Sequence, residues 1–169
     1  MSVNKRLYSR QFVHPVTLIS VSNGERENLA TMAWVSPVSF EPPMLMVAVS
    51  PKRFTHELVL DAKEFAIMVL SNLQKELATL AGTSTGRKVN KWELEPFKRL
   101  RRNAQFIQAP ILEKCRATYE CKLVNHIETG DHTLFIGEII HAEFDEEINP
   151  LILFNRNYYD IGKLIAKYP

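Results

Sequence analysis

The densest group of chemically useful residues lies between Asn28 and His56, in the stretch NLATMAWVSPVSFEPPMLMVAVSPKRFTH. Its first part is rich in small residues, which let a ligand come close to the backbone. Its last part carries Ser50, Lys52, Arg53 and Thr55. Arg and Lys side chains supply fixed positive charge, and hydroxyl groups donate to phosphate oxygens with little bulk. The stretch therefore predicts a site for an aromatic ligand that carries a phosphate.

A second group of residues concentrates positive charge between Gly82 and Arg102. It contains Arg87, Lys88, Lys91, Lys98, Arg99, Arg101 and Arg102, against Glu93 and Glu95. The whole chain has a formal net charge of only +2, so a charge argument must be local. We expect residues 98–102 to form a solvated or interface surface. Binding of RNA or DNA to this region is an alternative, although Trp92, Phe97 and Phe106 are spaced like packing residues.

Length and composition predict one compact domain over residues 1–169, because a chain that is 46% hydrophobic can bury a sizeable core. Cys115 and Cys121 would share one face of a strand, too far apart for a disulfide. We expect both to be reduced core residues, which indicates a cytoplasmic protein, and we expect no metal site. The N-terminus lacks the apolar region of a signal peptide, and no window resembles a membrane span.

The pattern of apolar residues predicts mostly strands with a few short helices. Asn23-Gly24 is a strong turn signal between two strand-like segments. Ser71 followed by Gln74 is typical of a capping box at the start of a helix. The elements expected in the first half are strands at 15–22, 28–35, 44–49 and 64–70, a helix from Thr55 or His56 to Ala62, and a helix from Ser71 to Ala81.

The second half predicts a long hairpin. Residues 115–123 alternate, with Cys115, Ala117, Tyr119, Cys121 and Leu123 on one face and Arg116, Thr118, Glu120 and Lys122 on the other. A turn at 129–131 leads to a strand over 132–144, and the tail from Pro150 predicts an edge strand followed by a short helix. Six or seven strands with two or three small helices indicate a mainly β, barrel-like fold.

The signatures GxGxxG, GxxxxGK[ST], HExxH and GxSxG are absent. The motifs NLATMAW, VSFEPP, SPKRFTHE, EFAIMVL, GTSTGRKVNKWE and GDHTLFIGE occur in this order instead. In this order they resemble the flavin reductase-like family of FMN-binding split-barrel proteins, in particular its flavoredoxin-like branch. The resemblance runs from about Pro15 to Gly137. It implies a six- to seven-stranded antiparallel split barrel that binds FMN.

The resemblance also implies roles for individual segments. Residues 28–33 match the segment whose backbone N–H groups reach the flavin ring, and residues 50–55 match the segment that holds the phosphate. The GTSTGRKVNK loop matches one that closes over the phosphate or ribityl end, sometimes from a neighbouring subunit. The cofactor-binding residues predicted in this way are Asn28, Leu29, Ala30, Thr31, Met32, Ala33, Ser50, Arg53, Thr55, His56, Ser84, Thr85, Gly86 and Lys91.

His132 is the candidate catalytic residue. The family often keeps a histidine at this position facing the flavin or the nicotinamide, where an imidazole could donate a hydrogen bond or shuttle a proton. The alternative is that Asp131-His132 only completes a hairpin turn. Trp34 invites a stacking role, but a tryptophan in such a strand is more often a core or interface residue.

Three functional hypotheses follow. The first is an NAD(P)H-dependent flavin reductase that binds FMN at or near a homodimer interface, with NADH or NADPH as its partner. The second is a flavoredoxin-like electron carrier, which would exchange electrons with a redox partner protein and have no NAD(P)H activity of its own. The third is a non-enzymatic nucleic-acid-binding module that uses the basic region. In the first two the cofactor carries the reaction, and the protein supplies position and electrostatics.

Overall fold

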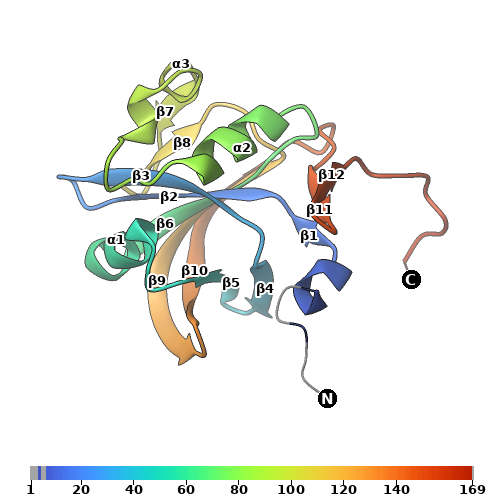
Figure 1. Cartoon of the computed structure of the whole chain (residues 1–169), viewed down its shortest axis with the longest axis horizontal. Helices are drawn as coiled ribbons and strands as arrows, with labels where there is room; N and C mark the ends of the chain where they lie inside the picture. The colour runs from blue at the N-terminus through green and yellow to red at the C-terminus, as the bar shows by residue number, and fades with distance from the viewer. Residues whose placement is uncertain (1–3, 5–6, 169) are drawn as a thin grey trace.

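The computed structural model describes residue 4 and residues 7–168, and its central feature is one curved antiparallel sheet (Figure 1). The sheet has seven strands in the order β3-β2-β6-β9-β10-β5-β4. Its strands are β2 (Thr17–Ser22), β3 (Glu27–Met32), β4 (Val35–Phe40), β5 (Pro43–Val49), β6 (Glu64–Val69), β9 (Ala117–Thr129) and β10 (His132–Phe144). Because β3 and β4 are the two edges, the sheet curls without closing between them. The predicted antiparallel split barrel is therefore confirmed.

The two predicted hairpins are present because their signals are local. Between β2 and β3, Asn23 Oδ1 accepts from the N–H groups of Glu25 and Arg26, at 3.1 and 2.7 Å. Gly24 in this turn has a φ of +90°, which a side chain would disfavour. The strands β9 and β10 have 13 residues each and pair along their length, with two register shifts. The predicted strand 28–35 is divided, because β3 ends at Met32 and β4 begins at Val35.

The helices are short and lie on the sheet. They are α1 (Phe54–Ala62), α2 (Lys75–Thr83) and α3 (Phe97–Leu100), with 3₁₀ turns η1 (Tyr8–Gln11) and η2 (Lys91–Glu93). The predicted start of α2 at Ser71 is wrong. Gln74 Oε1 does accept from the Ser71 N–H at 2.8 Å, but this bond closes a turn that precedes the helix. In the described part of the chain, none of these helices has the length and apolar character that crossing a bilayer requires.

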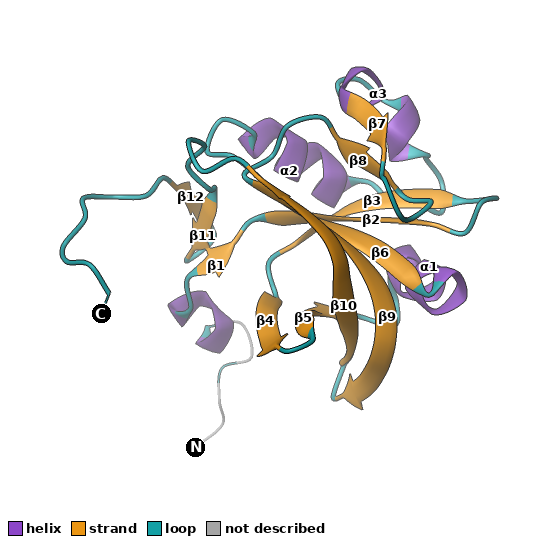
Figure 2. Cartoon of the chain, turned by 180° about the vertical axis from the view of Figure 1, so that it is seen from behind, coloured by secondary structure: helices purple, strands orange, loops and turns teal. Residues whose placement is uncertain are grey.

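Two small sheets complete the structure (Figure 2). One joins β1 (His14–Pro15), β11 (Ile152–Phe154) and β12 (Asn157–Tyr159), and the other joins β7 (Arg101–Asn103) to β8 (Pro110–Leu112). The predicted helix after the tail strand is wrong, because residues 160–168 have no regular structure and lead away from the body. A helix of that length is not stable in water without a surface to pack against.

Both faces of the sheet are covered, so the chain has two apolar clusters. Consecutive residues of a strand point into different clusters. Leu18 belongs to the cluster beneath α2 and β8, and Ile19 belongs to the cluster that contains residues of α1. This follows from the alternation of side chains along a strand. Cys115 and Cys121 are buried free thiols, one in each cluster, so their predicted common face is wrong. Burial raises the pKa of each thiol to about 12.

The β7–β8 loop covers the face of β9 that was predicted to be polar, so polar residues on this face are buried. Thr118 and Glu120 are buried. The Glu120 carboxylate accepts from the N–H groups of Gln105 and Phe106, at 2.8 and 2.6 Å, and so it caps the loop between β7 and β8. A carboxylate is buried here because the covering loop presents two backbone donors to it.

Candidate functional site

A cavity of about 880 Å³ opens between β3, the end of β5, the start of α1, the loop after α2 and the β9–β10 turn. Its size falls within the range of ordinary ligand sites. The structure brings together all but two of the predicted site residues around it. Those that line the cavity are Asn28, Ala30, Thr31, Met32, Ala33, Ser50, Arg53, Thr55, Ser84, Thr85, Gly86, Lys91 and His132.

The side chains of Leu29 and His56, which were also predicted, do not line the cavity. Leu29 is in the core beneath α2, because side chains alternate along β3. His56 Nε2 lies 2.8 Å from Thr133 Oγ1, and the ring packs edge-on against Phe135. Burial lowers the pKa of His56, and the charge of His126 lowers it further. His56 therefore joins α1 to β10.

One end of the cavity is arranged for an anion. Helix α1 begins at Phe54, and no side chain caps its first N–H groups. These groups and the helix dipole favour negative charge. Thr55 Oγ1 accepts from Asn28 Nδ2 at 2.8 Å, which leaves the threonine hydroxyl hydrogen free to donate. The guanidinium of Arg53 is exposed and forms no ion pair within residue 4 and residues 7–168.

The residues around Gly86 leave no room for a side chain at this position. A Cβ atom there would lie 2.1 Å from Asn28 Oδ1 and 2.8 Å from Phe54 Cδ1. Asn28 Oδ1 is itself buried and has no hydrogen-bond partner among the described residues. A buried acceptor without a partner is costly, and it lies at the edge of a cavity. A ligand that donates a hydrogen bond here would satisfy it.

Lys91 is buried in the cavity wall rather than extended into solvent. Its ammonium Nζ donates to the carbonyl oxygens of Leu29 and Ala81, at 2.6 and 2.8 Å. One of its three N–H donors therefore remains for a ligand. Burial lowers the pKa of Lys91 to about 8, with a further contribution from the nearby charge of Arg53. The residue fastens β3 to the end of α2 and adds positive charge to the cavity.

Small side chains form the wall opposite the turn. Ala30, Ala33 and Ala48 leave the backbone of β3 and β5 accessible. The Thr31 hydroxyl is not free to contact a ligand as a donor, because it donates to the Ala78 carbonyl at 2.5 Å and joins β3 to α2. Small side chains of this kind leave room for a planar ring against the backbone.

His132 stands at the mouth of the cavity beside Trp34, with ring centroids 4.8 Å apart. Its Nδ1 lies 2.7 Å from Asp131 Oδ1. A carboxylate only accepts, so Nδ1 carries the proton, and Nε2 is the atom left to act on a ligand. The hydrogen bond from His132 and its charge lower the pKa of Asp131. The pair Asp131-His132 thus belongs both to the hairpin turn and to the cavity.

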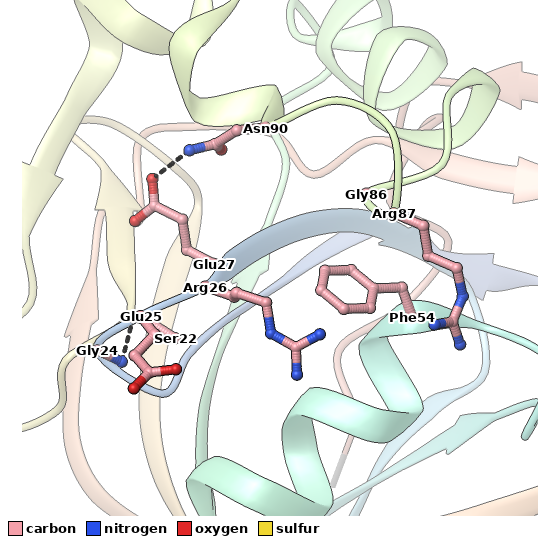
Figure 3. A pocket seen from close by; sticks show the side chains of 9 residues that line it. All are labelled: Ser22, Gly24, Glu25, Arg26, Glu27, Phe54, Gly86, Arg87 and Asn90. Atoms are coloured by element: carbon pink, nitrogen blue, oxygen red, sulfur yellow. Dashed lines mark hydrogen bonds between the residues drawn. The ribbon is translucent and has the colours of Figure 1, made fainter.

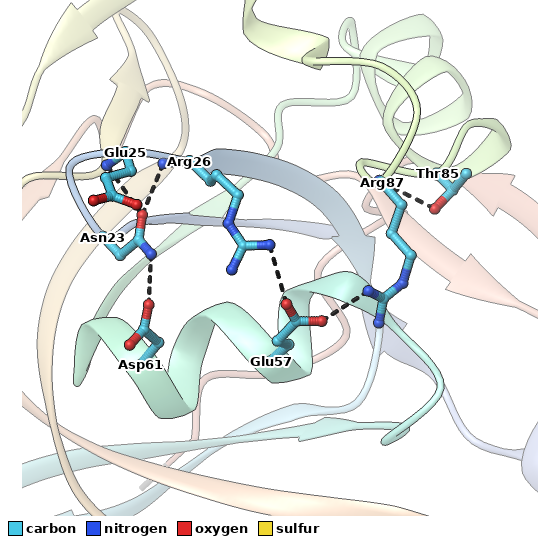
Figure 4. A network of polar contacts seen from close by, with 7 residues as sticks. All are labelled: Asn23, Glu25, Arg26, Glu57, Asp61, Thr85 and Arg87. Carbon is cyan, nitrogen blue, oxygen red and sulfur yellow. Dashed lines mark hydrogen bonds and ion pairs between the residues drawn. The ribbon is translucent and has the colours of Figure 1, made fainter.

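A second, polar cavity of about 550 Å³ adjoins the anion end and shares Phe54 and Gly86 with it (Figure 3). The guanidinium groups of Arg26 and Arg87 lie over the Phe54 ring, at 5.2 and 5.4 Å from its centroid. Glu57 accepts from both arginines, at 3.1 and 2.8 Å (Figure 4). The hydrogen bond from Arg87 is the main cause of the lowered pKa of Glu57. This network holds the loop that carries Gly86 against α1.

The basic region does not form an open nucleic-acid surface. Arg101 makes a bidentate pair with Glu27 at 2.6 and 2.9 Å, and Arg102 pairs with Glu143. Arg101 and Arg102 are thus partly exposed residues held in ion pairs, and their predicted place in a solvated or interface surface stays a prediction. Trp92 and Phe97 are buried and cannot stack on bases. The structure thus disfavours the nucleic-acid hypothesis.

Several lining residues were not predicted. They are Ala48, Val49, Phe54, Ala81, Gly82, Thr83 and Asp131, together with Trp34, for which packing was favoured, whereas Lys52 was noted for its charge but not among the predicted binding residues. Lys52, Gly82, Thr83 and Asp131 lie within or beside the motifs already recognised, so their proximity was a usable signal. Ala48 and Ala81 carry no chemical signal of their own. Only the tertiary structure places them at the cavity.

Comparison with known proteins agrees with this geometry. The family model for the flavin reductase like domain matches residues 9–162. The reductase component of an FADH(2)-dependent resorcinol hydroxylase from Rhizobium sp. (strain MTP-10005) is 30% identical over 161 residues, which are 92% of this chain and 84% of that protein.

Two solved structures have closely similar folds. The FMN-binding protein from Thermus thermophilus, with 1-cyclohex-2-enone bound, has a TM-score of 0.85 at 27% identity, covering 99% of this chain and 97% of that one. The flavoredoxin from Methanosarcina acetivorans has a TM-score of 0.86 at 25% identity, covering 99% of this chain and 94% of that one.

Proposed function

Because the chain belongs to the flavin reductase like domain family, we propose that it is an FMN-binding oxidoreductase of the NAD(P)H-dependent flavin reductase type. The observation that carries the proposal is one cavity that joins a wall of small residues to an unpaired anion site at the start of α1. A ligand that has a planar ring at one end and a phosphate at the other matches these two parts of the cavity. We treat residues 1–169 as a single flavin-binding domain.

The residues present fit FMN. The phosphate would be held by Arg53, by the hydroxyl groups of Ser50 and Thr55, and by the first N–H groups of α1. The ring would lie along residues 30–33, where Ala30 and Ala33 leave the backbone accessible and Met32 also lines the cavity. Asn28 Oδ1, which is buried and has no partner among the described residues, would accept a hydrogen bond from a donor group of the ligand. Lys91 would supply a further donor and charge.

When bound, FMN supplies two-electron redox chemistry. The chain's own residues would bind and orient the FMN and exchange protons with the ligand. His132, whose Nδ1 proton is fixed by Asp131, would exchange a proton with a ligand at Nε2. Trp34 supports the imidazole from one side.

We further propose that the protein forms a homodimer with FMN near the interface. The edge strand β4 lies next to the corner that lines the cavity, and it exposes Val38 by 50% and Phe40 completely. Exposed apolar residues on a free sheet edge favour pairing with another chain. Two buried free thiols are consistent with a cytoplasmic location. Analytical ultracentrifugation would test the dimer, since a monomer at all concentrations would contradict it.

The purified protein should be yellow and should release FMN on denaturation, identified by mass spectrometry. If it is isolated as apoprotein, titration should show tighter binding of FMN than of FAD, because the two arginines beyond the phosphate end already form ion pairs with Glu57. Anaerobic addition of NADH and then NADPH should bleach the flavin spectrum. Colourless protein that also fails to bind added FMN would contradict the proposal.

The flavoredoxin-like electron carrier is a second candidate, favoured by the likeness to the Methanosarcina acetivorans protein. It predicts tightly held FMN that NADH and NADPH reduce poorly. The same anaerobic titration separates the two functions. Rapid bleaching by either nucleotide supports the reductase, and bleaching only by dithionite supports the carrier.

A further inference from the structure

The loop of residues 84–90, which joins α2 to η2, forms part of the wall of two cavities. Its lining residues are Ser84, Thr85 and Gly86 in the cavity assigned to FMN, and Gly86, Arg87 and Asn90 in the polar cavity beside it. Gly86 lies against Phe54, the first residue of α1 (Figure 3). The position of this loop relative to α1 therefore decides how open the anion end of the FMN cavity is.

Arg87 ties the middle of the 84–90 loop to α1. The carbonyl of Thr85 accepts from the N–H groups of Lys88 and Val89, at 3.1 and 3.3 Å, so these hydrogen bonds stay inside the loop. Arg87 Nη1, in contrast, donates to Glu57 Oε2 at 2.8 Å. Within residue 4 and residues 7–168, this is the one hydrogen bond or ion pair between the loop and the helix.

Glu57 also separates two positive charges. Arg26, which directly precedes β3, donates to Glu57 Oε1 at 3.1 Å, so the carboxylate stands between two guanidinium groups (Figure 4). Both groups lie over the ring of Phe54, at 5.2 and 5.4 Å from its centroid. Two cations this near to one ring repel each other unless a negative charge lies between them. Without the carboxylate, this repulsion would push Arg87 and its loop away from the helix.

The bridge from Arg26 through Glu57 to Arg87 is open to water. The side chain of Glu57 is 41% exposed, and those of Arg26 and Arg87 are 51% and 50% exposed. The pair of Arg101 with Glu27 is more enclosed, at 31% and 16%. Exposed ion pairs are weak and are screened by salt. A bridge of this kind holds the loop in place and still breaks often enough for the loop to open.

We propose that Glu57 is a positioning residue, which through Arg87 keeps the 84–90 loop closed beside the phosphate end and so limits the rate at which FMN leaves. This rests on the proposed function, because it concerns the same FMN site. Glu57, Arg26 and Arg87 do not line the FMN cavity, so they act through the loop and not on the phosphate. The intact bridge makes FMN a slowly released cofactor, and its loss makes FMN a readily exchanged ligand.

The charge of Glu57 makes the direction of the effect diagnostic. A carboxylate near an anion site repels a phosphate, and its removal frees two guanidinium groups to attract one. If only the charge of Glu57 counted, Glu57→Gln would slow the release of FMN. A loop held closed by the bridge predicts the opposite, which is faster release.

The test is stopped-flow fluorescence of the full-length apoprotein, in excess, mixed with FMN over a range of protein concentrations. The intercept of the observed rate against concentration gives the release rate. Glu57→Gln and Arg87→Ala should each raise this rate about three- to tenfold. The double variant should release FMN no faster than Glu57→Gln alone, because both changes remove the same contact.

Asp61→Asn is the matched control. Asp61 lies on the same helix and accepts from Asn23 Nδ2 at 2.5 Å, but it does not contact the 84–90 loop, so the release rate should not change. The release rate of the wild type should also rise more from low to high salt than that of Glu57→Gln, because salt screens the bridge. A purely structural role of Glu57 would leave the two salt dependences equal.

Four results would overturn the proposal: unchanged or slower release in Glu57→Gln, an equal acceleration in Asp61→Asn, additive effects in the double variant, or equal salt dependences. If Glu57→Gln binds FMN and releases it at the wild-type rate, this inference alone fails. If the wild-type protein binds no FMN, the proposed function fails and this inference fails with it.

Discussion

Replacement of Gly86 by Ala is the sharpest perturbation of the anion end of the flavin cavity. Gly86 faces Phe54 across the loop and helix shown in Figure 3. An added Cβ would lie 2.1 Å from Asn28 Oδ1 and 2.6 Å from Asn28 Cγ. Ordinary contact begins at 3.4 Å, so the carboxamide oxygen or the loop must move by at least 1.3 Å. Asn28 is buried and donates to Thr55, so it has little freedom to turn.

The magnitude follows from two effects. Overpacking of a buried site costs about 1–3 kcal/mol. Loss of the 2.8 Å hydrogen bond between Asn28 and Thr55 costs about 1 kcal/mol more. We therefore expect Gly86→Ala to lower the free energy of unfolding by about 2–4 kcal/mol. Because Thr55 and the start of α1 also hold the phosphate in our proposal, the Kd for FMN should rise by about ten- to a hundredfold.

Both quantities are measurable on the same protein. Urea unfolding of the apoprotein gives the free energy, and quenching of flavin fluorescence gives the Kd. Gly162→Ala is the matched control, because no atom lies within 4 Å of its added Cβ and its φ is not left-handed. Wild-type stability and wild-type FMN affinity in Gly86→Ala would refute the steric argument. Reduced stability with unchanged affinity would refute only the placement of the phosphate.

Three further predictions concern charge. Arg53→Ala should raise the Kd for FMN about tenfold or more, whereas the exposed Arg99→Ala should not change it. The pKa of Lys91 is lowered to about 8, so its charge is present below that pH and lost above it; FMN affinity measured by fluorescence titration should fall as the pH rises through about 8, and Lys91→Met should abolish this dependence. Glu120→Ala removes the buried carboxylate that accepts from two partly buried N–H groups and should lower the free energy of unfolding in urea by about 2–4 kcal/mol, whereas the exposed Glu146→Ala should leave it unchanged.

The parts of the fold that depend on neighbouring residues were predictable. Asn23-Gly24 specifies the β2–β3 turn through the side chain and φ of two adjacent residues. The strand run at 44–49 and the helix after Arg53 follow in the same way. The start of α2 was not predictable, because the Ser71–Gln74 hydrogen bond occurs both in a capping box and in the isolated turn found here. Only contacts beyond the motif decide between them.

The alternation of polar and apolar residues along β9 likewise could not predict that the polar side chains on its second face are buried. The alternation around Glu120 is correct as geometry, since its side chain does point away from Cys121. Whether that face meets water depends on the loop between β7 and β8, which precedes β9 in the chain and folds over it. A polar residue opposite an apolar one therefore does not by itself indicate solvent.

For the site as well, the sequence indicates the residue types but not the tertiary contacts that explain them. Residue types identified Asn28, Thr55, Gly86 and Lys91, but the reasons for them lie in contacts between distant segments. Asn28 and Thr55 are 27 positions apart, and Lys91 bonds a carbonyl 62 positions away. Gly86 is required because the Asn28 carboxamide fills the space that a side chain would take, and Asn28 is fixed in turn because it orients Thr55 at the start of α1. A change at any of these positions should therefore disturb the others, so the phosphate affinity depends on how the three segments pack together and not on the cations alone.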